Sequence, residues 1–279
     1  MQTFYDFARI LKIKRYAHNT ITAYCGLLVS FHKFCGIHLP LGARNEAVIC
    51  TQVSNYVVQK KIAASTQRQL ISALRLYFSE MIKTTINLDQ IVPARRSQHL
   101  PVILNTAEVK KIINASQNIK HRTMLTMLTM LYALGLRSGE LINLKLTDFD
   151  KKRNSIHIKN AKGDKDRILP YPASLRPILQ QYYIAYKPIN YVFSGQNKEQ
   201  YSAQSLRKVF QAACKKAQIK KSVSPHSLRH AYATHLMDTG TDLRMIQKLL
   251  GHNDIKTTFI YTHVTQRSMQ QVPSPLDFL

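Results

Sequence analysis

The chain has 279 residues, 45% of them hydrophobic, and is long enough to form a substantial core as one large domain or two smaller ones. Its 40 Lys and Arg residues against 15 Asp and Glu residues give a formal net charge of +25, which indicates a polyanionic partner. No apolar run approaches the ~20 residues of a spanning helix, and the first ten residues lack a signal-peptide core, so we expect a cytoplasmic protein with no membrane partner.

Residues 1–84 are predicted to form a small helical bundle. Apolar residues recur at helical spacing over 19–34, 47–63 and 65–82. Asn19 is of a residue type that caps helix N-termini, so we expect it to begin the first of these helices.

The four cysteines, Cys25, Cys35, Cys50 and Cys214, form no C-x-x-C pair and lack the spacing of metal ligands. We expect reduced, buried thiols.

Residues 85–103 are predicted to be a linker, because Pro93 and Pro101 interrupt the helical pattern there. A second domain is expected over 104–279. Its first helix begins at Thr106, and a strongly apolar helix follows over about 121–134.

Residues 155–171 alternate between apolar and polar side chains around a glycine-containing turn, which predicts a β-hairpin with a basic tip. Helices are expected again over 202–217, 225–238 and 242–250. The predicted class is therefore α+β, mainly helical with a small β-hairpin or sheet.

Positive charge is spread along the whole chain. Positions 1–100 hold 13 basic and 4 acidic residues, and the remaining positions are also strongly basic. A charged tail therefore does not explain the net charge, and a polyanionic partner is expected for both domains; an anionic membrane or an acidic protein is the alternative, but neither an apolar helix face beside the basic residues nor an acylation signal is found in the sequence.

Several residues have chemistry that suits a phosphate site, although each also has an ordinary structural interpretation. Arg137 precedes Glu140 by three residues, so the two side chains can pair on one helix face. His226 and Arg229 share a face near the start of a helix that Ser224 is expected to cap, and such helix ends bind phosphate.

His226, His230 and His235 also suggest zinc, but no HExxH glutamate and no third ligand in register accompany them, so we expect no metal.

Three further candidates lie between and after these motifs. Lys162 falls at the hairpin tip, where a solvated turn is the simple alternative. His252 follows Gly251 where a helix must stop, so it either faces a cleft or is a solvent-exposed loop histidine. Tyr261 lies in a short segment, and taken alone it would be an ordinary core or surface aromatic.

The order of these residues resembles the active-site set of the tyrosine recombinase (phage integrase) family. The set comprises Arg137, Lys162, His226, Arg229, His252 and Tyr261. The surrounding segments LYALGLRSGELINL, KGDKDRILP, PHSLRHAYATHL and IQKLLGHNDIKTTFIYTHV are similar as well. NTITAYCGLLVSFHKF is similar to the SAM-like core-binding domain of the Xer-type and mobile-element branch.

The resemblance implies a site-specific recombinase that cleaves and rejoins DNA by transesterification through a 3′-phosphotyrosyl intermediate. It implies Tyr261 as the nucleophile, His226 as its proton acceptor or orienter, and Lys162 as the acid for the 5′ oxygen. Arg137, Arg229 and His252 would bind the phosphate. Glu140 and His230 would support them, and no cofactor is required.

The implied assembly is a C-shaped clamp on duplex DNA and a homotetramer on two duplexes. The tail 264–279 would pack either on its own domain or on a neighbouring subunit. A type IB topoisomerase and a catalytically silent DNA-binding protein on the same scaffold are the alternatives. Integration or excision of a mobile element and resolution of chromosome dimers are both compatible with the sequence.

Overall fold

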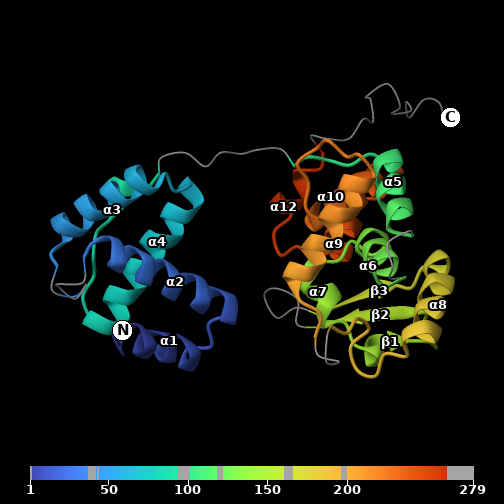
Figure 1. The fold of residues 1–279 in the computed structure, drawn as a ribbon, viewed down its shortest axis with the longest axis horizontal. Coiled ribbons are helices and arrows are strands. Elements are labelled where there is room, and N and C mark those ends of the chain that lie inside the picture. The colour runs from blue at the N-terminus through green and yellow to red at the C-terminus, as the bar shows by residue number, and fades with distance from the viewer. Residues whose placement is uncertain are drawn as a thin grey trace, which may run out of the picture. The chain divides into compact units, whose positions relative to one another are not determined.

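Helices form most of the computed structural model, which describes residues 2–36, 42, 44–93, 101–117, 122–159, 166–195 and 200–262 (Figure 1). The predicted class, mainly helical with a small sheet, is confirmed. The chain divides into two units, residues 1–98 and 99–279. Within the described ranges, no helix combines the length and the apolar character that crossing a membrane requires.

The first unit contains helices at the three predicted places and one helix that was not predicted. They are α1 (Gln2–Ile13), α2 (His18–Phe34), α3 (Glu46–Lys60) and α4 (Ala64–Tyr77), and α4 continues as a π-helix over Phe78–Ile82. The expected cap at Asn19 is wrong, because α2 begins one residue earlier, at His18, and places Asn19 inside the helix. The preceding residue, Ala17, has no capping side chain, so α2 starts without a side-chain cap.

The core of this unit is formed by the apolar faces of its four helices, with Phe7, Leu28 and Leu70 fully buried. Ile86 and Leu88 also pack in this core, ahead of a 3₁₀ turn at Asp89–Ile91. The predicted boundaries of the linker at 85 and 103 stay predictions, and residues 94–100 lie outside the described part.

All four cysteines are free thiols. Cys50 and Cys214 are buried, whereas Cys25 and Cys35 are half-buried.

The two paired strands of the predicted hairpin in the second unit are confirmed, and they belong to a three-stranded antiparallel sheet, whereas the predicted basic tip at 160–165 lies outside the described residues. The strands are β1 (Phe149–Asp150), β2 (Ser155–Ile158) and β3 (Arg167–Pro170), in the order β1-β2-β3. Ile156 pairs with Leu169 and both are buried, while Ile168 is exposed. One face of the sheet therefore joins the core.

The helices of the second unit agree with the predicted ones and add three more. They are α5 (Thr106–Gln117), α6 (Arg122–Ala133), α7 (Ser138–Asn143), α8 (Arg176–Tyr186), α9 (Ala203–Lys216), α10 (Pro225–Asp238), α11 (Leu243–Leu250) and α12 (Lys256–Phe259). Helix α6 packs against α5, α8 and α10, and its residues Met127, Leu128 and Leu131 are fully buried. This packing fixes α10, which supplies several candidate residues.

Two glycines with left-handed backbone end helices beside the site. Gly135 follows α6 with φ +58°, and Gly251 follows α11 with φ +64°. At both positions a side chain would be strained, and an added Cβ at Gly135 would lie 2.4 Å from the ring of Tyr232. The two turns present backbone carbonyl groups to the arginines described below.

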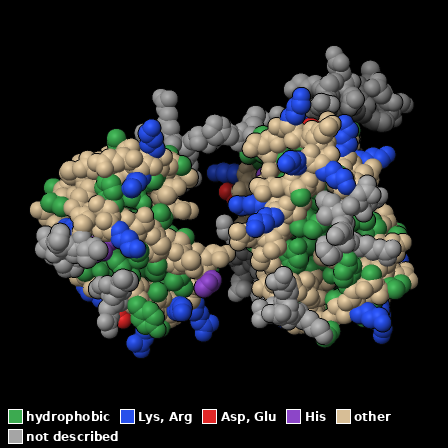
Figure 2. All heavy atoms as spheres, in the orientation of Figure 1, with side chains coloured by type: hydrophobic (Ala, Val, Ile, Leu, Met, Phe, Trp, Pro, Cys, Tyr) green, Lys and Arg blue, Asp and Glu red, His purple; other side chains and the backbone are tan. Residues whose placement is uncertain are grey.

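Lys and Arg side chains are spread over the visible surface of both units, and few Asp or Glu side chains accompany them (Figure 2). This distribution agrees with the net charge of +25.

Candidate active site

Arg137 and Glu140 pair at the start of α7, as their spacing predicts. The Arg137 Nη1 group donates to Glu140 Oε1 at 2.7 Å, and its backbone N–H donates to Oε2 at 2.8 Å. Its Nη2 group donates to the carbonyl of Gly251 at 3.1 Å. The Arg137 side chain is 23% exposed, so it holds Glu140 while one side stays open to a ligand.

Arg167 on β3 is a second partner of the same carboxylate, and sequence reasoning missed it. Its two Nη groups donate to the two oxygens of Glu140, each at 2.8 Å, and its Nε group donates to the carbonyl of Leu249 at 2.8 Å. The alternation of β3 gives the available signal, since Arg167 shares the buried face with Leu169.

Arg229 on α10 is fully buried and fixed by backbone carbonyl groups. It donates to Gly135 at 2.7 Å and to Leu250 at 2.5 Å, and it lies 3.8 Å from Glu140. Its Nε group is buried and has no hydrogen-bond partner among the residues that the structure describes. A buried donor of this kind is costly unless a ligand accepts from it.

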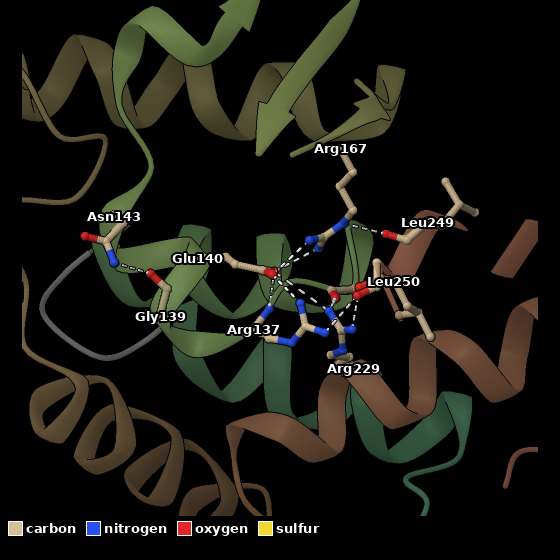
Figure 3. Close-up of polar contacts among 10 residues, drawn as sticks. Arg137, Gly139, Glu140, Asn143, Arg167, Arg229, Leu249 and Leu250 are labelled. Carbon is tan, nitrogen blue, oxygen red and sulfur yellow. Dashed lines mark hydrogen bonds and ion pairs between the residues drawn. The ribbon is translucent and has the colours of Figure 1, made fainter. Parts of the chain in front are cut away.

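Figure 3 shows the side chains of Arg137, Arg167 and Arg229 converging on Glu140. Three guanidinium groups around one carboxylate leave the cluster with excess positive charge. Burial alone would raise the pKa of Glu140, but the hydrogen bonds and charge of Arg167, with those of Arg137, lower it to about 2. Glu140 is therefore ionised at neutral pH.

Burial and the neighbouring Arg137 lower the pKa of Arg229 to about 9, so Arg229 stays charged at neutral pH. The cluster is thus a preformed site for an anion with several oxygens, such as a phosphodiester.

His252 follows the helix-ending Gly251 and is half-buried, so it is not the solvent-exposed loop histidine of the alternative interpretation. Its Nδ1 atom lies 2.9 Å from the hydroxyl of Thr258, which is itself fully buried. Burial and the charge of Arg229 lower the pKa of His252 to about 4. Thr258 fixes the ring at Nδ1 and leaves Nε2 for a ligand.

Tyr261 is 1% exposed and lies just after α12, in a small cluster with Ile246 and Leu250 of α11. Its hydroxyl lies 3.0 Å from Nδ1 of His230. Burial raises the pKa of Tyr261, while the charges of Arg229 and Arg137 act in the opposite direction. The phenol is therefore protonated at neutral pH in the absence of a ligand.

His226 is exposed and is the second residue of α10, one turn before His230. The two rings meet edge to face with centroids 4.6 Å apart. Among the hydrogen bonds of the described residues, Tyr261 has its side-chain bond with His230 and none with His226.

The second unit thus brings together five of the six predicted residues, with both supporting ones. The sixth, Lys162, lies outside the described residues, as does the predicted tail 264–279. Within the described ranges, no three His, Cys, Asp or Glu side chains gather as a metal site requires.

An open cavity of about 740 Å³ adjoins the cluster on the side of Arg167, Gly251 and His252. Arg244 and Lys248 of α11 also line it. Their positive charges extend the anion-binding surface beyond the arginine cluster.

Two family models match most of this chain. Residues 103–268 match the phage integrase family, and residues 4–88 match the phage integrase N-terminal SAM-like domain. Tyrosine recombinase XerD of Listeria monocytogenes serotype 4b is 31% identical over 284 residues, covering 96% of this chain and 95% of XerD. An integrase/recombinase of Escherichia coli is 29% identical, covering 96% of this chain and 91% of that protein.

A solved structure of a lambda integrase tetramer bound to a Holliday junction has a TM-score of 0.74 and 18% identity. The match covers 98% of this chain and 79% of lambda integrase.

Proposed function

Because this chain belongs to the phage integrase family and is a site-specific DNA recombinase of the tyrosine type, we propose that its strand cleavage takes place at the arginine cluster of the second unit. The observation that supports this proposal is the convergence of Arg137, Arg229, His252 and Tyr261 around one positively charged site. Arg229 is fully buried, and its Nε group has no partner within the described part of the chain, so it is suited to act as a preorganised hydrogen-bond donor to a phosphate.

Arg137, Arg229 and His252 are assigned to binding the non-bridging oxygens of the scissile phosphate. Negative charge increases on these oxygens as a fifth oxygen approaches phosphorus, so donors fixed in advance favour the transition state. Glu140 and Arg167 position Arg137, and Thr258 positions His252.

Tyr261 is assigned as the nucleophile. Its phenolic oxygen bonds to phosphorus, the bond from phosphorus to the 5′ oxygen breaks, and Lys162 protonates the departing oxygen. A free phenol with a pKa of about 10 must lose its proton at a cost of about 4 kcal/mol at pH 7, which a base and a cationic site can offset. The resemblance gives His226 as that base or as an orienter, and His230 as a supporting residue.

The 3′-phosphotyrosyl bond retains the energy of the broken phosphodiester. Attack by a 5′ hydroxyl rejoins the strand and releases Tyr261, without nucleotide hydrolysis. The proposed chemistry needs no cofactor.

The partner is double-stranded DNA that contains recombination sites, and we propose a homotetramer on two duplexes. The lambda integrase neighbour is a tetramer on a Holliday junction, and this supports the assembly. Closure of the two units as a clamp, exchange of the tail 264–279 between subunits, and action in the cytoplasm belong to the same proposal. Relatives that are recombinases favour this function over a topoisomerase or a silent DNA-binding protein.

The test is covalent adduct formation on a nicked duplex that carries candidate sites from DNA flanking the gene, without metal or ATP. We expect an SDS-resistant, protease-sensitive adduct on the 3′ side of the break with the unaltered protein and none with Tyr261→Phe. Tyr132→Phe is a matched control that should still form the adduct, because the hydroxyl of Tyr132 is likewise hydrogen-bonded to a histidine of α10, His235. Sites that are bound but yield no adduct would refute the enzyme assignment.

A further inference from the structure

Two histidines of α10 lie near Tyr261, and their contacts with it differ. His230 Nδ1 lies 3.0 Å from the phenolic oxygen, which is the distance of a direct hydrogen bond. His226 instead contacts the ring of His230, edge to face, and is exposed at the helix start. A base must lie within hydrogen-bond reach of the proton that it removes.

We propose that His230 is the catalytic residue that accepts the phenolic proton of Tyr261 during strand cleavage, and that His226 positions the His230 ring. This inference rests on the proposed function, because it requires Tyr261 to be the nucleophile.

The surroundings keep His230 neutral and therefore able to accept a proton. Burial, with the charges of His226 and Arg229, lowers the pKa of His230 to about 4. Besides α10, the charged and titratable groups of the site come from the start of α7, from β3 and from the segments after α11 and α12, and comprise Arg137, Glu140, Arg167, His252 and Tyr261. Their net charge is positive, and a bound phosphodiester would offset part of it, which would raise the basicity of His230 when substrate is present.

The proton balance of the step is complete. The O–H bond of Tyr261 breaks as its oxygen bonds to phosphorus, and the proton moves to Nδ1 of His230. The bond from phosphorus to the 5′ oxygen breaks, and that oxygen takes a proton from Lys162. Rejoining reverses both transfers, so His230 returns its proton to Tyr261 and no external acid or base is consumed.

The hydrogen bond orients the phenol as well. In neutral His230 the proton must lie on Nε2 if Tyr261 donates to Nδ1. The edge-to-face contact with His226 fixes the plane of the His230 ring. This accounts for a second histidine in the pair without requiring it to contact the nucleophile.

The experiment is a pH profile of the cleavage rate on a nicked duplex in which sulfur replaces the 5′ bridging oxygen of the scissile phosphate. A thiolate leaves without a proton, so the profile no longer reports Lys162. The variant is His230→Asn, whose amide lies where Nδ1 was and keeps a hydrogen bond to Tyr261 without a base. We expect a rate about 10²- to 10⁴-fold lower near neutral pH.

The shape of the profile separates a base from a structural residue. Without its base, Tyr261 must ionise to solvent, so the rate of His230→Asn should rise about tenfold per pH unit. The cleavage rate of the unaltered protein should be nearly independent of pH over the same range. The cleavage rate of His226→Asn should be lower than that of the unaltered protein, but equally independent of pH.

His235→Asn is the matched control, because His235 makes the same contact, from Nδ1 to the hydroxyl of Tyr132 at 2.9 Å, on the same helix. It should leave rate and profile unchanged. The inference would be overturned if the cleavage rate of His230→Asn did not depend on pH, or if the rise with pH appeared in His226→Asn instead. In either case Tyr261 would remain the nucleophile. An adduct formed by Tyr261→Phe would refute the proposed function itself. His230→Gln replaces His230→Asn should the latter not fold.

Discussion

Glu140 holds the arginine cluster together, since it is the carboxylate that Arg137 and Arg167 share and its side chain is 4% exposed. Glu140→Gln would leave these guanidinium groups without their counter-charge. Breaking a buried pair in this way costs about 3–5 kcal/mol. We therefore expect urea denaturation at neutral pH to show an unfolding free energy about 3–5 kcal/mol lower for Glu140→Gln than for the unaltered protein. We also expect Glu140→Gln to lose strand cleavage.

The pH dependence of this loss follows from the lowered pKa of Glu140. The pKa is about 2 in the folded protein against an ordinary value of 4.5, so folding favours the ionised form. The linked contribution to stability, on the order of 3 kcal/mol, is fully present above pH 4.5 and is lost as pH falls towards 2. The difference in unfolding free energy between Glu140→Gln and the unaltered protein should therefore become smaller as the pH falls from 4.5 to 2. A difference that stayed constant would contradict this assignment of the Glu140 pKa.

A surface pair provides the comparison. Arg75 and Asp89 lie 2.7 Å apart with side chains 42% and 80% exposed. Asp89→Asn should change the unfolding free energy by less than about 1 kcal/mol at either pH.

Arg167→Lys tests whether the site needs the several hydrogen bonds of the planar guanidinium group of Arg167 or only its positive charge. Lysine keeps the positive charge but cannot donate to both oxygens of Glu140 and to the Leu249 carbonyl together. We expect about 1–3 kcal/mol less stability and a cleavage rate at least about tenfold lower. Arg153→Lys, in an exposed turn of the same sheet, should match the unaltered protein in chemical denaturation and in cleavage.

The sequence identifies the residues with characteristic spacing but not those defined by contacts between distant segments. Arg137 with Glu140, and His226 with Arg229, lie one helical turn apart, so periodicity groups them. Arg167 reaches Glu140 across 27 positions, and the bond from His230 to Tyr261 spans 31 positions. Local patterns contain no information about either distance.

At the scale of elements, helix ends build the site as much as helix interiors do. Gly251 ends α11 in the left-handed conformation, and its carbonyl accepts from Arg137. A Cβ added there would lie 3.0 Å from the Cδ atom of Arg167. The turn thus connects the end of α11 with β3 and the start of α7.

Gly251→Ala is expected to lower the unfolding free energy by about 1–2 kcal/mol through backbone strain. It should lower cleavage more than this stability loss explains, because Arg167 and Arg137 both shift. Gly26→Ala is the control, since Gly26 lies inside α2 and, apart from the nearby backbone of α2 itself, an added Cβ would meet no atom of the described residues within 4 Å. It should stabilise by about 0.5–1 kcal/mol without changing cleavage. If Gly251→Ala and Gly26→Ala changed cleavage equally, the turn at Gly251 would not position Arg137 and Arg167.

Elements with strong periodicity are predictable, and short or irregular ones are not. Helices α2, α10 and α11 and the hairpin occur where the sequence indicates them. The two-residue β1 is too short to have a pattern of its own, and its pairing with β2 defines it. The start of α2 also differs from the prediction, because Asn19 fits a cap by residue type alone.

At the scale of the whole molecule, positive charge on both units and the cavity beside His252 suggest extensive contact with DNA phosphates. Arg244 and Lys248 extend the surface along α11, one helical turn apart. Each cation that neutralises a phosphate releases a counterion, so binding weakens as salt rises. The slope of the logarithm of the binding constant against the logarithm of salt concentration then counts the phosphates contacted.

The variant Lys248→Gln tests whether the cavity beside His252 belongs to the surface that contacts DNA phosphates. We expect weaker binding of any duplex and a slope smaller by about one unit, because one phosphate contact is lost. Arg153→Gln removes one charge as well, but its turn, which joins β1 to β2, lies at the opposite end of β2 from Arg167. Its slope should equal that of the unaltered protein in a salt titration of fluorescent duplex. Since net charge falls equally in both variants, a difference between their slopes can only come from position, and equal slopes would exclude the cavity from the DNA interface.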